Sequence, residues 1–188
     1  MHLLLGKFYI DFSYNQQALD ELKSVLAERP DLPFAHFNLG VVYQRLGSLD
    51  KAAEEYRKEI AISPREPWSY ENLGKVLLDE RSPDQAIPLF RRALSLYTKL
   101  PDSWAGLGRS YLQEKRINEA ITCYRRALAL DPDNSKLHYQ LGQAYTKSGE
   151  KAAAQKEFAE TRKLQNVSLE RQAQRLSGRL PSSTASVP

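Results

Sequence analysis

The chain has 188 residues, of which 41% are hydrophobic and 27% charged, a composition that excludes disorder throughout and a collagen-like fibre. The formal net charge of +4 arises beyond residue 160, because residues 1–160 contain 22 basic and 22 acidic side chains. The body of the chain is therefore electrically neutral and gives no reason to expect a nucleic-acid partner.

The N-terminal segment is strongly apolar, but it predicts neither a membrane span nor a signal peptide. Its apolar runs, 3–5 and 8–10, are separated by Gly6 and Lys7 and fall far short of the roughly 20 residues that cross a bilayer. No basic region precedes them and no small-residue cleavage site follows. We therefore expect no membrane partner and a cytoplasmic location, or a periplasmic one if the chain is a fragment of a longer exported protein.

A repeat of 34 residues runs through the chain. Leu-Gly pairs recur at this interval and end at Gly6, Gly40, Gly74, Gly108 and Gly142. A ring-bearing residue stands three places before each leucine, at His2, His36, Tyr70, Trp104 and His138. An alanine keeps the same register, and four residues after it come Leu22, Tyr56, Phe90, Tyr124 and Phe158. Landmarks that stay in phase over five units predict a repeat architecture.

Each unit contains two helical patterns. In the second unit, positions 36, 39, 40 and 43 are spaced i, i+3, i+4, i+7, and Ala52, Tyr56 and Ile60 form a second stripe. A short turn lies between the two patterns; in the third unit it contains Ser82 and Pro83, which indicate a helix start. One helical pair cannot bury both stripes, so the pairs are expected to stack around a continuous core.

This pattern resembles the tetratricopeptide repeat, a helix-turn-helix unit of 34 residues. The resemblance covers residues 1 to about 168 and implies an all-α, right-handed superhelical α-solenoid. Its expected units are about 1–32, 33–66, 67–100, 101–134 and 135–168. A proline that closes the unit is present at Pro30, Pro64 and Pro132, while Thr98 and Asn166 replace it in the third and fifth units.

Both ends of the repeat differ from its middle. The fifth unit carries polar residues where the fourth is apolar, and Leu169, Ala173, Leu176 and Leu180 follow at helical spacing. We therefore expect a capping helix over 169–180 and a disordered tail over 181–188. The first unit lacks its first two positions, and Leu3 and Phe8 lie on a side of its stripe that lacks a neighbour. Self-association through this incomplete unit is a further expectation.

No sequence pattern predicts catalysis or a cofactor. The chain has no dinucleotide, P-loop, zinc-protease or serine-hydrolase motif. The three histidines occupy the ring position of the repeat, which favours a place in the core over metal ligation. Cys123, the single cysteine, is interpreted as a structural thiol. The basic pairs 57–58, 91–92 and 125–126 recur on second helices and are expected to face solvent instead of nucleic acid.

The resemblance implies a concave groove that is lined by the first helix of each unit and binds peptide segments. We expect its ligand contacts from Phe34, Phe37, Asn38, Val41, Arg45, Trp68, Glu71, Asn72, Lys75, Arg109, Lys136 and Tyr139. The alternative is that Phe34, Phe37 and Trp68 only pack against neighbouring first helices. The three large rings outside the core stripe favour a ligand-binding groove, because they form more apolar surface than a face that only contacts water needs.

The residues of two specialised binding modes of the family can be compared with this sequence. Some members hold a terminal carboxylate with a lysine one residue after the core ring, but the corresponding residues are Phe37, Glu71, Ala105 and Tyr139. That clamp is absent. The repeat region of O-GlcNAc transferase has an asparagine just before the Leu-Gly pair, and Asn38 and Asn72 match it. These two amides are expected to hydrogen-bond a bound backbone.

The sequence thus predicts a non-catalytic scaffold that binds a peptide segment of a partner protein. The groove is aromatic in the second unit and slightly basic beyond it, which favours a ligand with acidic residues beside an apolar anchor. The alternative is a helper or substrate-recruiting region of a larger enzyme, or of a secretion or assembly protein, whose other domains precede Met1.

Overall fold

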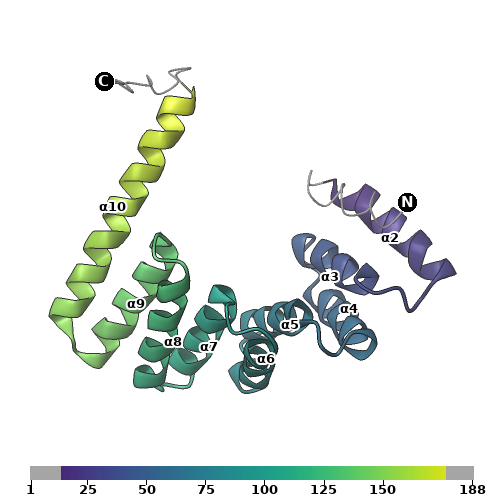
Figure 1. Ribbon diagram of the computed structural model, residues 1–188, viewed down its shortest axis with the longest axis horizontal. Helices are drawn as coiled ribbons and strands as arrows, with labels where there is room; N and C mark the ends of the chain where they lie inside the picture. Colours follow the sequence, from purple (N-terminus) through teal and green to yellow (C-terminus); the bar gives the residue numbers. More distant parts are fainter. Residues whose placement is uncertain (1–13, 177–188) are drawn as a thin grey trace, which may run out of the picture.

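The computed structural model describes residues 14–176. In this part of the chain there are nine helices and no strand: α2 (Asn15–Glu28), α3 (Ala35–Arg45), α4 (Leu49–Ile62), α5 (Pro67–Asp79), α6 (Pro83–Leu96), α7 (Pro101–Gln113), α8 (Ile117–Leu130), α9 (Ser135–Ser148) and α10 (Lys151–Leu176). Each helix packs against the next in the chain, and α5 also contacts α7. The helices form one row from α2 to α10 (Figure 1). The all-α solenoid predicted from the repeat is confirmed.

Each unit from the second onward contains the predicted pair of helices: α3 with α4, α5 with α6, α7 with α8, and α9 with α10. The second helix of the first unit is α2, whereas the landmarks of its first helix, including Gly6, lie outside the described residues. The helix start predicted near Ser82 is confirmed because α6 begins at Pro83, although the Ser82 side chain makes no capping hydrogen bond.

The repeated glycines allow an aromatic ring to lie against the first helix of each unit. A Cβ atom placed on Gly40 would lie 2.6 Å from Cε1 of Tyr56, and one on Gly108 would lie 2.8 Å from the same atom of Tyr124. Gly74 faces Phe90 and Gly142 faces Phe158 in the same way. These distances are too short for any side chain larger than hydrogen, so glycine fixes the close approach of the two helices.

The aromatic residues of the second helices are the largest side chains of the core. Tyr56, Phe90 and Tyr124 are fully buried. One apolar cluster extends from α4 to α10, and a smaller one joins α2 to α3 through Leu22, Leu39 and Val42. Burial of both helical stripes therefore requires neighbouring units, as the sequence pattern indicates.

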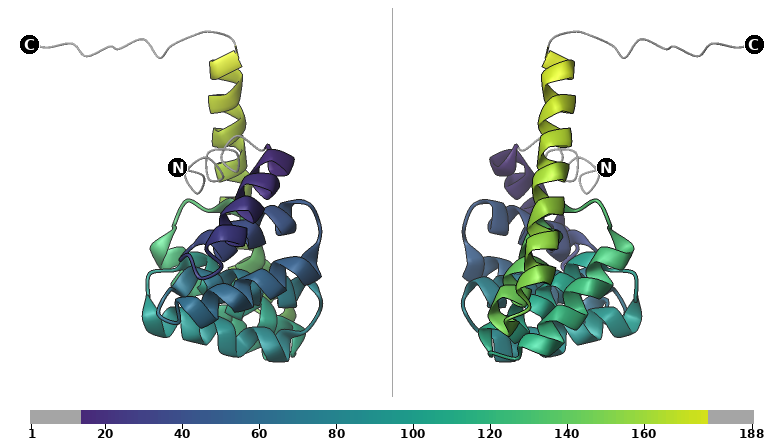
Figure 2. Two further views of the ribbon diagram at one scale, coloured as in Figure 1. Left: turned by 90° about the vertical axis from the view of Figure 1, so that its right-hand side faces the viewer. Right: turned by 90° about the vertical axis from the view of Figure 1, so that its left-hand side faces the viewer.

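The C-terminal end differs from the expected capping helix. The segment is helical to Leu176, but it is not a separate element, because α10 runs without a break for 26 residues from Lys151. It projects beyond the other helices (Figures 1 and 2), and Leu169 is exposed. The second helices α2, α4 and α8 end two residues before a proline, whereas residues 164–176 contain neither proline nor glycine. The second helix of the fifth unit therefore continues into the segment expected to form the cap. Residues 177–188, including the expected tail, lie outside the described residues.

The first helix of each unit ends with the same backbone turn. The amide of Ser48 donates to the carbonyl of Tyr43, and equivalent bonds join Ser82 to Leu77 and Arg116 to Tyr111. This is a Schellman motif, which needs a left-handed residue just before the donor. Gly47 and Gly149 have φ values of 74° and 85°, but Arg81 and Lys115 adopt 60° and 61° at the corresponding positions.

We predict that Arg81→Gly and Lys115→Gly each raise the free energy of unfolding by about 1 kcal/mol, because glycine removes the steric cost of the left-handed backbone. Chemical denaturation of each variant measures the change. Arg125→Gly, at an exposed site inside α8, is the control and should lower stability by about 1 kcal/mol. A loss of stability at position 81 or 115 would contradict the prediction.

Candidate functional site

A polar groove of about 300 Å³ lies along the first helices of the solenoid. Its walls include Lys75, Asp79, Asp102, Arg109 and Lys136, which come from α5, α7 and α9. Three of the cationic side chains predicted to contact a ligand are therefore brought to one surface. Leu78 and Ala105 supply apolar floor between them.

Several charges of this groove are paired with one another. Lys75 donates from Nζ to Oε1 of Glu71 and to Oδ2 of Asp102, at 2.8 Å in both cases. Ser103 donates to the other oxygen of Glu71 at 2.6 Å. Arg109 donates to Asp79 at 2.9 Å. These bonds join α5 to α7 and leave Glu71, which is 5% exposed, below the groove surface.

The pairing also determines the charge state of Lys75. Its partial burial disfavours the charged ammonium, but the carboxylates of Glu71 and Asp102 outweigh this effect and raise the pKa of Lys75 above its usual value. Lys75 is thus a fixed cation that pairs with two carboxylates. Lys136 differs, because its side chain makes no ion pair with any residue in the range 14–176.

A second, apolar pocket of about 450 Å³ lies where α5 begins. Phe34 and Trp68 form its aromatic walls, and Pro64, Arg65 and Pro67 complete it. The two aromatic side chains are 47% and 48% exposed. The structure therefore brings together two of the three predicted aromatic anchors. Phe37 instead packs against Tyr56, with ring centroids 5.9 Å apart. Tyr56 belongs to α4, the second helix of the same unit, whereas the packing alternative named neighbouring first helices.

The position of Phe34 depends on a buried carboxylate. Phe34 is the residue before α3 and has a left-handed φ of 65°. Its amide donates to Oε1 of Glu59 at 2.9 Å, and the amide of Phe37 donates to Oε2. Glu59 is fully buried in α4 and caps the N-terminus of α3, where a negative charge is favourable. In α5 the same role falls to Glu66, which accepts from the amides of Trp68 and Ser69.

The remaining predicted contacts are spread over the same face. Asn72 donates from its side chain to the carbonyl of Trp68, 2.9 Å away in its own helix. Asn38 is half-buried, Val41 packs at the edge of the core, and Arg45 is exposed at the end of α3. Tyr139 lies apart from the polar groove and packs against Phe158. Asn38 and Asn72 each lie one helical turn after an aromatic wall of the pocket, but one amide donor of Asn72 is used internally.

The ring position of the repeat has a role that the sequence interpretation missed. His36 contacts the carbonyl oxygen of Pro30 at 2.8 Å, and His138 contacts that of Pro132 at 2.9 Å. Tyr70 and Trp104 donate to the corresponding carbonyls of Pro64 and Thr98. The second ring nitrogen of each described histidine meets a carboxylate, from Glu55 or Glu157. These rings therefore bind the loop that connects one unit to the next. No metal-binding cluster occurs among the described residues.

The basic pairs on the second helices also make internal contacts. Arg91 donates to the hydroxyl of Tyr111 at 2.7 Å, and Arg92 lies over the ring of Tyr70. Arg126 lies over Trp104. Since these cations stack on rings of the solenoid, they are less available to phosphates than a row of cations that contacts only water.

Cys123 is buried, and burial raises the pKa of its thiol to about 11, which disfavours the nucleophilic thiolate. None of the described helices is long and apolar enough to span a bilayer.

Comparisons with known proteins match the repeat. Two family models described as "Tetratricopeptide repeat" match residues 33–66 and 77–126, and one described as "TPR repeat" matches 108–149. A search of curated proteins gave no match.

Solved structures share the fold at low sequence identity. The structure described as "Crystal structure of MamA" is 22% identical, with a TM-score of 0.78 over 88% of this chain and 96% of that chain. MamA from Desulfovibrio magneticus RS-1 is 19% identical, with a TM-score of 0.80 over 88% and 94%. YrrB, described as "a TPR protein with an unusual peptide-binding site", is 18% identical, with a TM-score of 0.72 over 88% and 85%. At these identities the likeness concerns the fold alone.

We predict that Lys75→Met lowers the free energy of unfolding by about 2 kcal/mol, because the Glu71 carboxylate then stays buried without its cation. Adding Glu71→Gln should recover most of this loss, since a neutral amide costs less to bury and can still accept from Ser103. Chemical denaturation of the single and double variants measures both effects. Lys136→Met is the control and should change stability by less than about 0.5 kcal/mol. Equal losses in the single and double variants would show that the ion pair is not the cause.

Proposed function

The chain belongs to the tetratricopeptide repeat family and is a protein-interaction scaffold; we propose that it binds a peptide segment of a partner protein along the inner face of α3, α5, α7 and α9. The observation that carries this proposal is the apolar pocket between Phe34 and Trp68, whose helix α5 also lines the polar groove. Half-exposed rings that frame a pocket offer large apolar contact area at a small cost in side-chain entropy.

The strained backbone at Phe34 supports a binding role for this pocket. A left-handed conformation costs an aromatic residue on the order of 1 kcal/mol, and such strain gathers at ligand-binding positions. Here the two bonds to Glu59 hold the strained residue in place, while its ring stays half-exposed. The strain of the left-handed backbone at Phe34 is therefore not offset by burial of its ring in the core.

The aromatic pocket and the polar groove share the face of one helix. Trp68 and Lys75 are seven residues apart in α5, which places them on one side, two turns from each other. A peptide with an apolar anchor between Phe34 and Trp68 therefore continues over Asn72 toward Lys75 and Arg109. The path is bordered on α3 by Phe37, Asn38, Val41 and Arg45. Tyr139 lies outside it, in the contact between α9 and α10.

The paired charges specify what such a peptide contributes. Because Lys75 and Arg109 are already paired with Glu71, Asp102 and Asp79, they attract an acidic ligand only weakly. Lys136 has no such partner among the described residues and lines the same groove. We therefore assign the acidic residue of the ligand to Lys136, and the apolar anchor supplies most of the affinity. Binding of this kind is only mildly sensitive to salt.

We predict that Phe34→Gly combined with Trp68→Ala weakens peptide binding at least about thirtyfold, or about 2 kcal/mol, because an aromatic anchor is lost. Glycine is chosen at position 34 because it keeps the left-handed backbone and the amide bond to Glu59. The probe is a peptide selected from a display library on the unchanged chain, and titration calorimetry measures its Kd.

The matched control removes two equally exposed apolar side chains outside the pocket. Leu46 and Tyr97 are 45% and 46% exposed at the ends of α3 and α6, so Leu46→Ala with Tyr97→Ala should leave the Kd within about twofold. Circular dichroism first establishes that both double variants are folded. An unchanged Kd in the pocket variant, or an equal loss in the control, would refute the groove proposal.

A further inference from the structure

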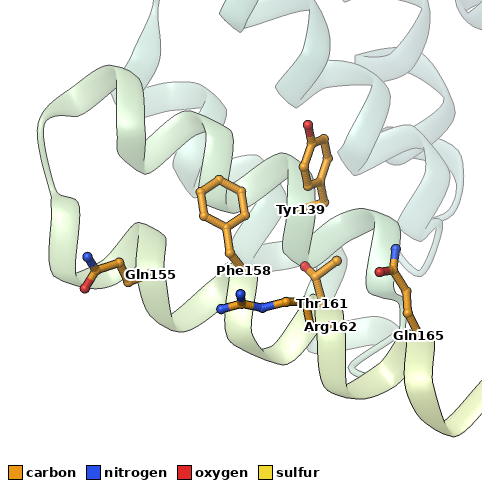
Figure 3. Close-up of a pocket in the computed structure, with 6 residues that line it drawn as sticks. All are labelled: Tyr139, Gln155, Phe158, Thr161, Arg162 and Gln165. Atoms are coloured by element: carbon orange, nitrogen blue, oxygen red, sulfur yellow. The ribbon is translucent and has the colours of Figure 1, made fainter.

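The solenoid ends in a pocket that is separate from the peptide groove. It has a volume of about 500 Å³ and lies between α9 and α10. Figure 3 shows its lining, with Tyr139 from α9 and Gln155, Phe158, Thr161, Arg162 and Gln165 from α10. The rings of Tyr139 and Phe158 pack 5.7 Å apart. Tyr139 is 48% exposed, so the floor of the pocket is aromatic and open.

The same surface is covered at every earlier junction of the solenoid. Phe158 occupies the repeat position of Phe90 and Tyr124, which are fully buried, whereas Phe158 is only partly buried. The helix that covers Phe90 is α7: a Cβ atom placed on Gly106 would lie 2.3 Å from Cζ of Phe90. The exposed end therefore has the shape that accepts the first helix of a repeat unit.

One segment outside the described residues has the sequence of such a helix. Residues 1–13 repeat the landmarks of the first helices, with Leu5 and Phe8 in the places of Leu39 and Val42. Leu39 and Val42 pack on Leu22 of the preceding second helix, α2. In a unit that follows α10, Leu5 and Phe8 would meet Phe158 in the same way. The segment thus offers apolar side chains at the positions that a second helix contacts.

We propose that residues 1–13 of one copy dock in the pocket between α9 and α10 of a second copy. Within one copy, α2 directly follows this segment and lies at the opposite end of the row from α10 (Figure 1), so the contact joins two copies. It is a head-to-tail contact between two different surfaces. Such a contact does not close on itself and adds one copy at a time.

The experiment is sedimentation velocity on the full chain and two blocked variants over a hundredfold range of concentration. Phe8→Asp blocks the docking segment, and Tyr139→Asp with Gln165→Asp blocks the pocket. We expect the unchanged chain to grow beyond two copies as concentration rises. Each variant alone should remain a single copy. An equimolar mixture should form a species of two copies, because each variant keeps the surface that the other lacks.

Other outcomes would overturn the proposal. If either variant still forms dimers alone, the contact is symmetric and does not use these surfaces. An unchanged chain that stays a single copy also refutes the proposal; hydrogen exchange at residues 154–165 then shows whether the chain's own residues 177–188 cover the pocket or leave it for a partner helix. Phe8→Ser replaces Phe8→Asp if circular dichroism shows that the charge impairs folding. The peptide affinity of both variants separates this result from the groove proposal, since the pocket of Phe34 and Trp68 is intact in each.

Discussion

From the second unit to the fifth, the close contact between a glycine of the first helix and an aromatic ring of the second helix sets the geometry of the solenoid. Since a Cβ atom at Gly40 or Gly108 would lie within 3 Å of the ring, the distance between the paired helices is fixed by the thickness of an aromatic side chain. Tyr56 and Tyr124 are consequently fully buried. The repeat of 34 residues is therefore a repeat of one packing contact, and the position of every inner-face residue follows from it.

Because the first helices are held at a regular spacing, charges on neighbouring helices meet directly across the inner face. The bonds from Lys75 to Glu71 and Asp102 join adjacent units and make the polar groove nearly neutral. A neutral groove does not select its ligand by charge alone. In the proposed binding mode, specificity rests on the apolar pocket, where Phe34 is placed by a carboxylate of the second helix in its own unit. The proposed recognition surface is thus built from contacts within and between units, not from one helix.

The features that recur in every unit could be predicted from the sequence, because each landmark is repeated in phase. The helical pairs, the buried rings and the inner face belong to this group. Features specific to one unit could not be predicted. The left-handed Phe34 depends on Glu59, 25 residues away, and the pairing of Lys75 with Asp102 depends on how α5 and α7 stack. The continuous α10 follows from the lack of a proline or glycine in residues 164–176, which the apolar spacing of the expected cap obscured.

A solenoid has two kinds of binding surface, and they follow from the same packing rule. The inner face is available along its whole length because the core contacts use the other sides of the first helices. In the third unit, Phe90 is buried because α7 of the next unit packs on it. In the last unit no such helix follows among the described residues, so Phe158, at the same repeat position, is only partly covered and forms the end surface. The proposed binding on the inner face and the proposed contact through the end use different residues, Trp68 and Lys136 in one case and Phe158 and Gln165 in the other. A chain of this kind therefore has the means to hold a peptide and to join another copy at the same time.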